Sequence, residues 1–230
     1  IIGATPIDFG KSTTLEDLEQ YLVDNGFEIN VSLWKNTTKQ DIIRLKWGNC
    51  NIVVSHAGVE LAEYMKQRYN IPYVTGLPFG EKYSEIWLEK LGKVIEKFKD
   101  TENGREVCEA VGKKQEEAVT EKRVLMIGEQ FQAMSIRNAL ETEYGLRGDV
   151  AGICGFRTEF AREGDRFLES EAEIEQMLND DKYDLVIGDP LYKELIYTDK
   201  KFYAYSHYAV SSKLGNEEAE SLIGRNMNVI

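Results

Sequence analysis

His56 and His207 are the only histidines among 230 residues, and each directly follows a short apolar run typical of a β-strand. An imidazole at the end of a strand can reach a cleft, where it donates a proton near neutral pH or binds a metal. Cys154 ends a third such run, and its sulfur is a soft metal ligand. These positions predict His207 and His56 as catalytic residues and Cys154 as a cofactor-binding residue. The alternatives are hydrogen-bonded structural histidines and an inert buried thiol.

A second candidate for chemistry is the stretch Gly10-Lys11-Ser12-Thr13, which looks like part of a phosphate-binding loop. The standard loop has a glycine five residues before Gly10, where this chain has Thr5, and Pro6 removes an amide donor. The spacing therefore favours a turn whose hydroxyls cap a helix that ends at Gly26. Asp189 follows an apolar run at the place of a magnesium-binding acid, which makes it a cofactor-binding candidate.

Three cysteines, Cys50, Cys108 and Cys154, are far apart and form no C-x-x-C pair. This spacing indicates reduced thiols rather than a zinc site or a disulfide framework. An iron–sulfur cluster usually takes four thiolates. We therefore expect the isolated chain to carry no bound cofactor.

Composition narrows the possible partners. The formal net charge of −12 makes nucleic acid and an anionic membrane unfavourable partners. No apolar run approaches the roughly 20 residues that span a bilayer, and no secretory leader precedes Ile1. These features predict a cytoplasmic protein. Because the sequence starts on a strand pattern without Met, we also expect it to be a piece of a longer polypeptide.

The elements that position these residues occur in two similar series. Short apolar runs alternate with amphipathic segments of helix length, a pattern typical of an α/β fold with mainly parallel sheets. We expect two Rossmann-like or flavodoxin-like lobes, each with about four or more strands, and a ligand cleft between them. The predicted domains are residues 1–97, a helical connection at 98–121, and residues 122–230. Predicted strands include residues 27–33, 50–55, 71–75, 123–128, 149–153 and 184–188, and predicted helices include residues 39–47, 59–69, 132–144 and 169–178.

Several segments in a fixed order carry a resemblance to a known family. They are Ile2-Gly3-Ala4-Thr5-Pro6-Ile7-Asp8-Phe9, Asn51-Ile52-Val53-Val54-Ser55, Tyr69-Asn70-Ile71-Pro72, Leu77-Pro78-Phe79-Gly80, Lys122-Arg123-Val124 and Tyr183-Asp184-Leu185-Val186-Ile187-Gly188. Together they resemble the second and third domains of nitrogenase component 1-type oxidoreductases. That family includes the nitrogenase molybdenum–iron protein subunits, their cofactor-assembly scaffolds and the dark-operative protochlorophyllide reductase subunits.

The resemblance implies an oxidoreductase subunit that holds a metallocluster or an unsaturated substrate between its domains. Its partners would be a homologous component 1-type subunit and an ATP-dependent iron–sulfur reductase that delivers electrons. The cysteines for the family's bridging iron–sulfur cluster belong to a first domain that this sequence lacks, so the chain alone is expected to be inactive.

Individual residues follow from the same resemblance. His207 resembles the family's histidine ligand of the cofactor, which makes it a metal-ligand candidate as well. The family's cysteine ligand is replaced, because the matching stretch has Ser55 and His56 but no thiol. This favours a relative with another substrate or cofactor, with Ser55 and Gly58 as cofactor-binding candidates. The alternative function is a non-redox, two-lobed module that binds a small ligand or a nucleotide in the same cleft.

Overall fold

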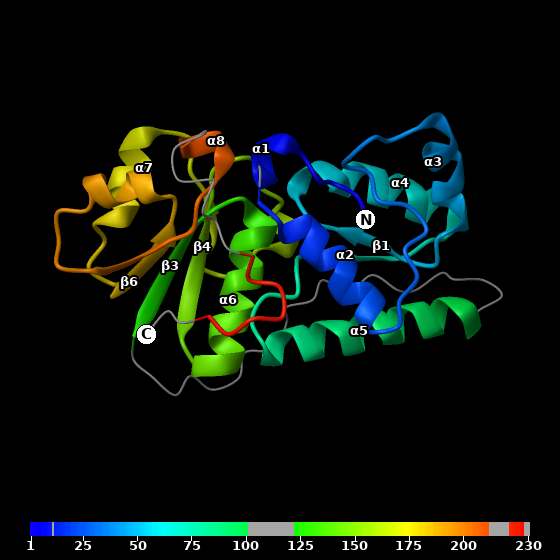
Figure 1. Ribbon diagram of the computed structural model, residues 1–230. Helices are drawn as coiled ribbons and strands as arrows, with labels where there is room; N and C mark the ends of the chain where they lie inside the picture. The colour runs from blue at the N-terminus through cyan, green and yellow to red at the C-terminus, as the bar shows by residue number, and fades with distance from the viewer. Residues whose placement is uncertain (11, 101–121, 212–220, 228–230) are drawn as a thin grey trace.

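The computed structural model describes residues 1–10, 12–100, 122–211 and 221–227. It has a mixed α/β fold with two separate parallel sheets, as the alternating pattern predicts (Figure 1). The helices and 3₁₀ turns (η) of the described residues are α1 Pro6–Phe9, α2 Thr14–Asp24, α3 Lys39–Arg44, η1 Leu45–Trp47, η2 His56–Gly58, α4 Val59–Tyr69, α5 Lys82–Asp100, α6 Gln130–Tyr144, η3 Thr158–Phe160, α7 Glu171–Leu178, η4 Pro190–Leu195 and α8 Tyr208–Ser211. The strands are β1 Asn51–Val53, β2 Tyr73–Thr75, β3 Arg123–Gly128, β4 Arg147–Gly152, β5 Arg166–Phe167, β6 Leu185–Gly188 and β7 Lys201–Ala204.

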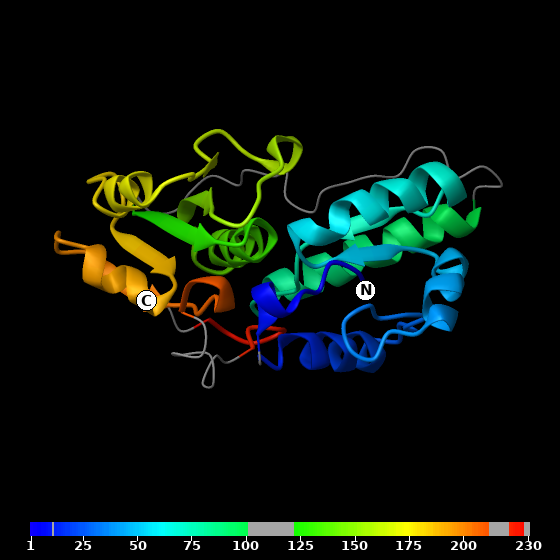
Figure 2. The same ribbon diagram turned by 90° about the horizontal axis from the view of Figure 1, so that it is seen from above.

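The first lobe is built around a two-stranded sheet in which β1 and β2 run parallel. Ile2 adds a single bridge to Val53, so the amino-terminal segment lies beside β1. Helices α4 and α5 lie on one side of this sheet and α2 on the other (Figure 2). Leu18 and Leu22 of α2 and Trp87 of α5 are buried in the same core, because each helix turns one apolar face toward the strands.

The prediction of about four strands in this lobe is wrong. Residues 27–33 do not form a strand, although the segment does lie beside the amino terminus. The Ile1 amino group donates to the Val31 carbonyl at 2.8 Å, and the Leu33 amide donates to the Ile1 carbonyl at 2.9 Å. A strand needs a continuing ladder, and here the partner segment turns away into α1 after Ile2. The helix predicted over residues 39–47 is likewise divided into α3 and η1.

The second lobe contains a five-stranded parallel sheet with strand order β5-β4-β3-β6-β7. Alternate residues of β3 face opposite sides, as expected for a pleated strand. Val124 and Met126 join the core that also contains the first lobe, whereas Leu125 and Ile127 join a smaller core with α7 and η4. The centre of the sheet is therefore covered on both faces, which explains the continuous apolar runs of β3 and β6.

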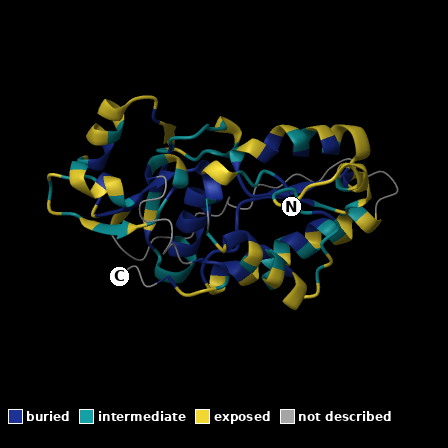
Figure 3. Ribbon diagram, turned by 45° about the horizontal axis from the view of Figure 1, so that its top comes forward, coloured by how far each residue is buried: buried dark blue, intermediate teal, exposed yellow. Residues whose placement is uncertain are grey.

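Helix α6 lies between this sheet and the first lobe. All of its residues from Gln130 to Leu140 are buried, which distinguishes it from the half-exposed outer helices (Figure 3). Glu129 caps its amino terminus, and Gly145 ends it in the left-handed conformation that glycine adopts without strain. Because α6 begins at the carboxyl end of β3, its first turn is placed where ligands bind in such folds.

The predicted division into residues 1–97, 98–121 and 122–230 stays a prediction. Most of the predicted helical connection, residues 101–121, lies outside the described residues, and α5 ends at Asp100. Residues 221–227 return to the first half of the chain, where Ile223 bridges Phe79 and the Gly80 amide donates to the Leu222 carbonyl at 3.0 Å. Among the described helices, none combines the length and apolar composition that crossing a membrane requires.

Candidate functional site at the interface between the lobes

His207 lies at the interface between the two lobes, three residues after β7. Its Nε2 atom is 3.6 Å from Oδ1 of Asp8, which lies in α1 of the first lobe. Both side chains are buried, with only 3% of His207 and 8% of Asp8 exposed. Neither ring nitrogen of His207 has a hydrogen-bond partner within the described part of the chain. The structure thus brings an imidazole and a carboxylate together from opposite lobes, in a site shielded from water.

Asp8 remains acidic in spite of its burial. Thr5 caps α1, and its hydroxyl donates to Oδ2 of Asp8 at 2.7 Å. Burial by itself raises the pKa of Asp8. The polar side chains around the carboxylate, those of His207, Thr5 and Ser55, act in the opposite direction and hold the pKa below its ordinary value. An ionised Asp8 therefore faces the imidazole at neutral pH.

Glu129 is a second buried carboxyl group at the same interface. Its Oε2 accepts hydrogen bonds from the amides of Phe131 and Gln132, each at 2.9 Å, in the first turn of α6. Its Oε1 accepts from the His56 amide of the first lobe at 2.8 Å. Burial, followed by the nearby charge of Asp8, raises the pKa of Glu129 to about 8 even though these amides favour the charged form. Glu129 therefore connects the lobes and can hold a proton at neutral pH.

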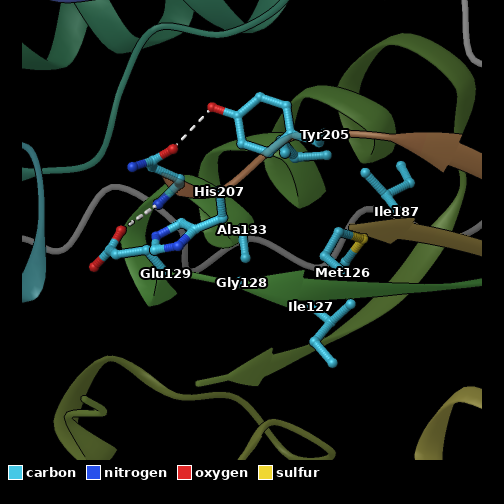
Figure 4. A pocket seen from close by; sticks show the side chains of 10 residues that line it. Met126, Ile127, Gly128, Glu129, Ala133, Ile187, Tyr205 and His207 are labelled. Carbon is cyan, nitrogen blue, oxygen red and sulfur yellow. Dashed lines mark hydrogen bonds between the residues drawn. The ribbon is translucent and has the colours of Figure 1, made fainter. Parts of the chain in front are cut away.

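A small cavity adjoins this group of side chains (Figure 4). Glu129, Gln132 and His207 form its polar end, and residues of β3, β6 and α6 form its apolar end. The volume open to the centre of a water-sized sphere is about 10 Å³, close to the minimum that one water molecule needs. The cavity therefore borders the site, and it is far too small to hold a substrate.

The residues predicted in the first lobe gather at its edge toward the second lobe. Ser55 is fully buried and caps η2, and its hydroxyl donates to the Gly3 carbonyl. The ring of His56 lies directly against Gly155: a Cβ added to Gly155 would be only 2.8 Å from Nδ1 of His56. Gly58 packs directly on the backbone of Gly3, where a side chain would collide. Ser55 and His56 thus border the site, and Gly58 packs against the backbone of Gly3, while its predicted role in cofactor binding stays a prediction.

The two further predictions of the second lobe fall at the same interface. Cys154 is partly buried in the loop after β4, and burial, followed by the charges of Asp8 and Glu129, raises its pKa to about 11. A thiol with such a pKa is a poor nucleophile. Asp189 is fully buried, and its two oxygens accept from the backbone amides of Leu191, at 3.0 Å, and His207, at 2.9 Å. Asp189 therefore anchors the segment that carries His207.

The metal-binding potential of the described residues depends on the grouping of their donor side chains. Within them, no group of three or more His, Cys, Asp or Glu side chains has the arrangement to hold a metal ion. Cys50 and Cys154 form no disulfide within the described residues, and Cys108 lies outside them. The donor set around His207 consists of one imidazole and buried carboxyl groups that already accept hydrogen bonds. This set suits proton transfer better than cluster ligation, and the metal role of His207 goes no further than the resemblance.

Asp8 and Glu129 are functional candidates that the sequence analysis missed. A signal existed for each of them. Glu129 is the first residue after β3, the same position relative to a strand that drew attention to the histidines. Asp8 stands three residues after the capping Thr5, a spacing that indicates a helix start rather than a site. Its partner His207 is nearly the whole chain away, so no local pattern connects them.

A match to a known protein family identifies the family of this chain. The nitrogenase component 1 type oxidoreductase family matches residues 1–202, most of the chain. The chain belongs to this family. The resemblance found in the sequence is therefore confirmed. His207 lies just beyond the matched residues, so its role remains a matter of its own geometry.

Several individual relatives share one name. A light-independent protochlorophyllide reductase subunit from Prochlorococcus marinus subsp. pastoris is 25% identical over 183 residues, covering 77% of this chain and 34% of the relative. Subunits of the same name from a Bradyrhizobium species and from Porphyra purpurea are 25% and 24% identical, and each match covers 71% of this chain. A solved structure of nitrogenase Cp1 at pH 6.5 aligns over 76% of this chain and 42% of its own, with 14% identity and a TM-score of 0.43. The chain spans about a third of the length of these curated relatives, between 32% and 35%.

Proposed function

We propose that this chain is part of a reductase subunit that holds an unsaturated substrate at the interface between its lobes. Electrons would come from an ATP-dependent iron–sulfur reductase, and the Asp8–His207 pair would supply a proton. The observation that carries this proposal is the buried pair itself, with 3.6 Å between an imidazole and a carboxylate from opposite lobes. Membership of the nitrogenase component 1 type family supports the redox character.

The chemistry of such a reduction explains why an acid is needed. Saturating a carbon–carbon double bond adds two electrons and two protons, and a proton must be donated where each new C–H bond forms. An imidazolium beside an ionised carboxylate is a suitable donor, because the carboxylate orients the ring and stabilises its charge. We assign one of the two protons to His207. Asp8 would stabilise the imidazolium before transfer, and the neutral ring left after transfer would take up a proton from the surroundings to restore the donor.

The remaining parts of the proposed enzyme lie outside this chain. We assign the iron–sulfur cluster to the part of the parent protein that the relatives have in addition, since within the described residues no group of three or more His, Cys, Asp or Glu side chains is arranged to hold a metal ion. A homologous component 1-type subunit would be the second partner. The widely spaced cysteines, without a disulfide framework, fit a cytoplasmic protein.

The test uses the intact parent protein together with its reductase component and ATP. The probe is protochlorophyllide, which the names of the relatives identify as their substrate. We expect His207→Gln to lower the rate of reduction by about 10²–10⁴, the usual contribution of a general acid, without a change in the unfolding midpoint. Lys93→Gln, an exposed residue of α5, is the control and should reduce at the normal rate.

Two results would contradict the proposal in different ways. Normal reduction by His207→Gln would remove the proton role of the pair. A parent protein that binds a small ligand or nucleotide but accepts no electrons would instead favour the non-redox binding module.

A further inference from the structure

Gln132, in the first turn of α6, contacts both sides of the Asp8–His207 pair. Its Nε2 donates to the backbone carbonyl of Asp8 at 3.1 Å. Its Oε1 accepts from the hydroxyl of Tyr205 at 2.9 Å, a bond drawn in Figure 4. Tyr205 stands two residues before His207. One side-chain amide therefore joins the segment that carries the carboxylate to the segment that carries the imidazole.

The amide itself is held firmly. Gln132 is only 3% exposed, and its own backbone amide donates to Glu129. On the far side, the Tyr205 amide donates to the Gly188 carbonyl of β6 at 2.8 Å, and the His207 amide donates to Asp189. The segment with His207 is thus fixed to the second lobe. The bond from Gln132 to the Asp8 carbonyl then determines how closely α1 of the first lobe approaches it.

The distance within the pair makes this contact important. At 3.6 Å, Nε2 of His207 and Oδ1 of Asp8 are just beyond hydrogen-bond length, so a small shift of α1 would change their coupling greatly. We propose that Gln132 is a positioning residue that sets the separation of Asp8 and His207 by bonding to both of their segments. The catalytic meaning of this assignment rests on the proposed function, whereas the geometric coupling does not.

Chemistry explains why the position holds a glutamine. A carbonyl oxygen such as that of Asp8 only accepts hydrogen bonds, so it needs a donor, while the Tyr205 hydroxyl donates and needs an acceptor. A carboxamide supplies one of each from a single planar group. An ionised glutamate would lose the donor, and an aliphatic side chain would lose both contacts.

The experiment measures the pKa of Asp8 in the folded chain by the pH dependence of its carboxyl ¹³C chemical shift. Burial raises this pKa, whereas the nearby imidazole of His207 lowers it. If Gln132→Leu lets α1 move away, the lowering weakens and the pKa of Asp8 rises. Tyr205→Phe removes a single hydroxyl and should cause a smaller rise in the same direction.

Asn138→Leu is the matched control. Asn138 is a buried amide two turns further along α6, and it also donates with its nitrogen, to Tyr83 at 3.0 Å, and accepts with its oxygen, from Arg162 at 2.9 Å. Its loss should cost similar stability without touching the pair. We therefore expect the pKa of Asp8 in Asn138→Leu to equal that of the unmodified chain.

An unchanged Asp8 pKa in folded Gln132→Leu would overturn the inference, as would an equal rise in Asn138→Leu. If Gln132→Leu does not fold, Tyr205→Phe decides the question alone, because it leaves every apolar contact of the ring in place. A rise in the Gln132 variant, combined with a parent protein that reduces no substrate, would confirm the positioning and reject only the proposed function.

Discussion

Replacing Gly58 by alanine should destabilise the chain through a collision between two backbones. A Cβ at this position would lie 2.9 Å from both N and Cα of Gly3 and 3.0 Å from the Ile2 carbonyl oxygen. Ordinary contacts begin at 3.4 Å, so the segments would have to separate by about 0.5 Å. Ile2 cannot move freely, because its amide and carbonyl are bonded to Ile52 and Val54 on β1 and just beyond it.

The magnitude follows from this overpacking. Forcing one extra carbon into a close-packed contact costs about 1–3 kcal/mol. Gly58 has φ of −87°, so alanine adopts the backbone conformation without strain and gains about 0.4–1 kcal/mol from the unfolded state. The gain offsets part of the cost, and we expect a net loss of about 1–2 kcal/mol.

Gly92→Ala in α5 is the matched control, because a Cβ there has no atom within 4 Å. It should stabilise the chain by about 0.5–1 kcal/mol, as alanine does inside a helix. Comparing the two alanine variants largely cancels the effect on the unfolded state, so the difference between them isolates the collision.

Urea unfolding at one pH measures both free energies, and thermal unfolding should separate the variants by about 2–4 °C per kcal/mol for a chain of this size. A Gly58→Ala variant as stable as Gly92→Ala would show that the two backbones do not collide. That result, together with weakened binding of a substrate, would assign Gly58 to the ligand site instead.

Three further predictions follow from buried groups. The pKa of Glu129 lies near 8 in the fold and at about 4.5 otherwise, so the stabilisation that depends on its proton is full below pH 4.5 and is lost as the pH rises through 8. Glu129→Gln should therefore weaken the dependence of the urea-unfolding free energy on pH between 5 and 8, and an unchanged dependence would contradict the assignment. The pKa of Cys154 is raised to about 11, so its thiol should react with iodoacetamide at pH 8 far more slowly in the folded chain than in urea. Mass spectrometry of the Cys154 peptide follows the reaction, and equal rates would show that the thiol is accessible and ionised. Arg137 and Asp165 form a salt bridge of 2.6 Å, and each side chain is only 1% exposed. Arg137→Leu should therefore lower the free energy of unfolding by about 3–5 kcal/mol, because it leaves the Asp165 charge buried and unpaired. A loss below about 1 kcal/mol in chemical unfolding would contradict this prediction.

Regular elements with strong local patterns could be predicted from the sequence alone. The runs that became β3 and β6 are largely apolar, because helices or turns cover both faces of their sheet. Helices α2, α4 and α6 were predicted within a few residues, since their apolar spacing and end signals are local properties. The order of motifs was also sufficient to indicate the family, which the match over residues 1–202 confirms.

Pairing between distant segments was decided only by the tertiary structure. Residues 27–33 have apolar alternation but remain without a strand, because their neighbour at Ile1 continues for too few residues to form a ladder. Asp189 could be read as a magnesium-binding acid, yet its two oxygens bind backbone amides. In both cases the folded chain supplies contacts that the local pattern does not record.

In the candidate site too, some residues could be predicted from the sequence and others only from the tertiary structure. Placement after strands made His56, His207 and Cys154 candidates, because the carboxyl ends of parallel strands meet at one edge, and their roles stay predictions. Asp8 and Gln132 carried no comparable signal, since each acquires its role from partners far away in the chain. Packing of α6 between the lobes buries these side chains and brings their polar atoms within hydrogen-bonding or electrostatic range. A linear pattern records residue types and spacing, but burial and charge proximity, which set the acidity of Asp8 and Glu129, exist only in the folded chain.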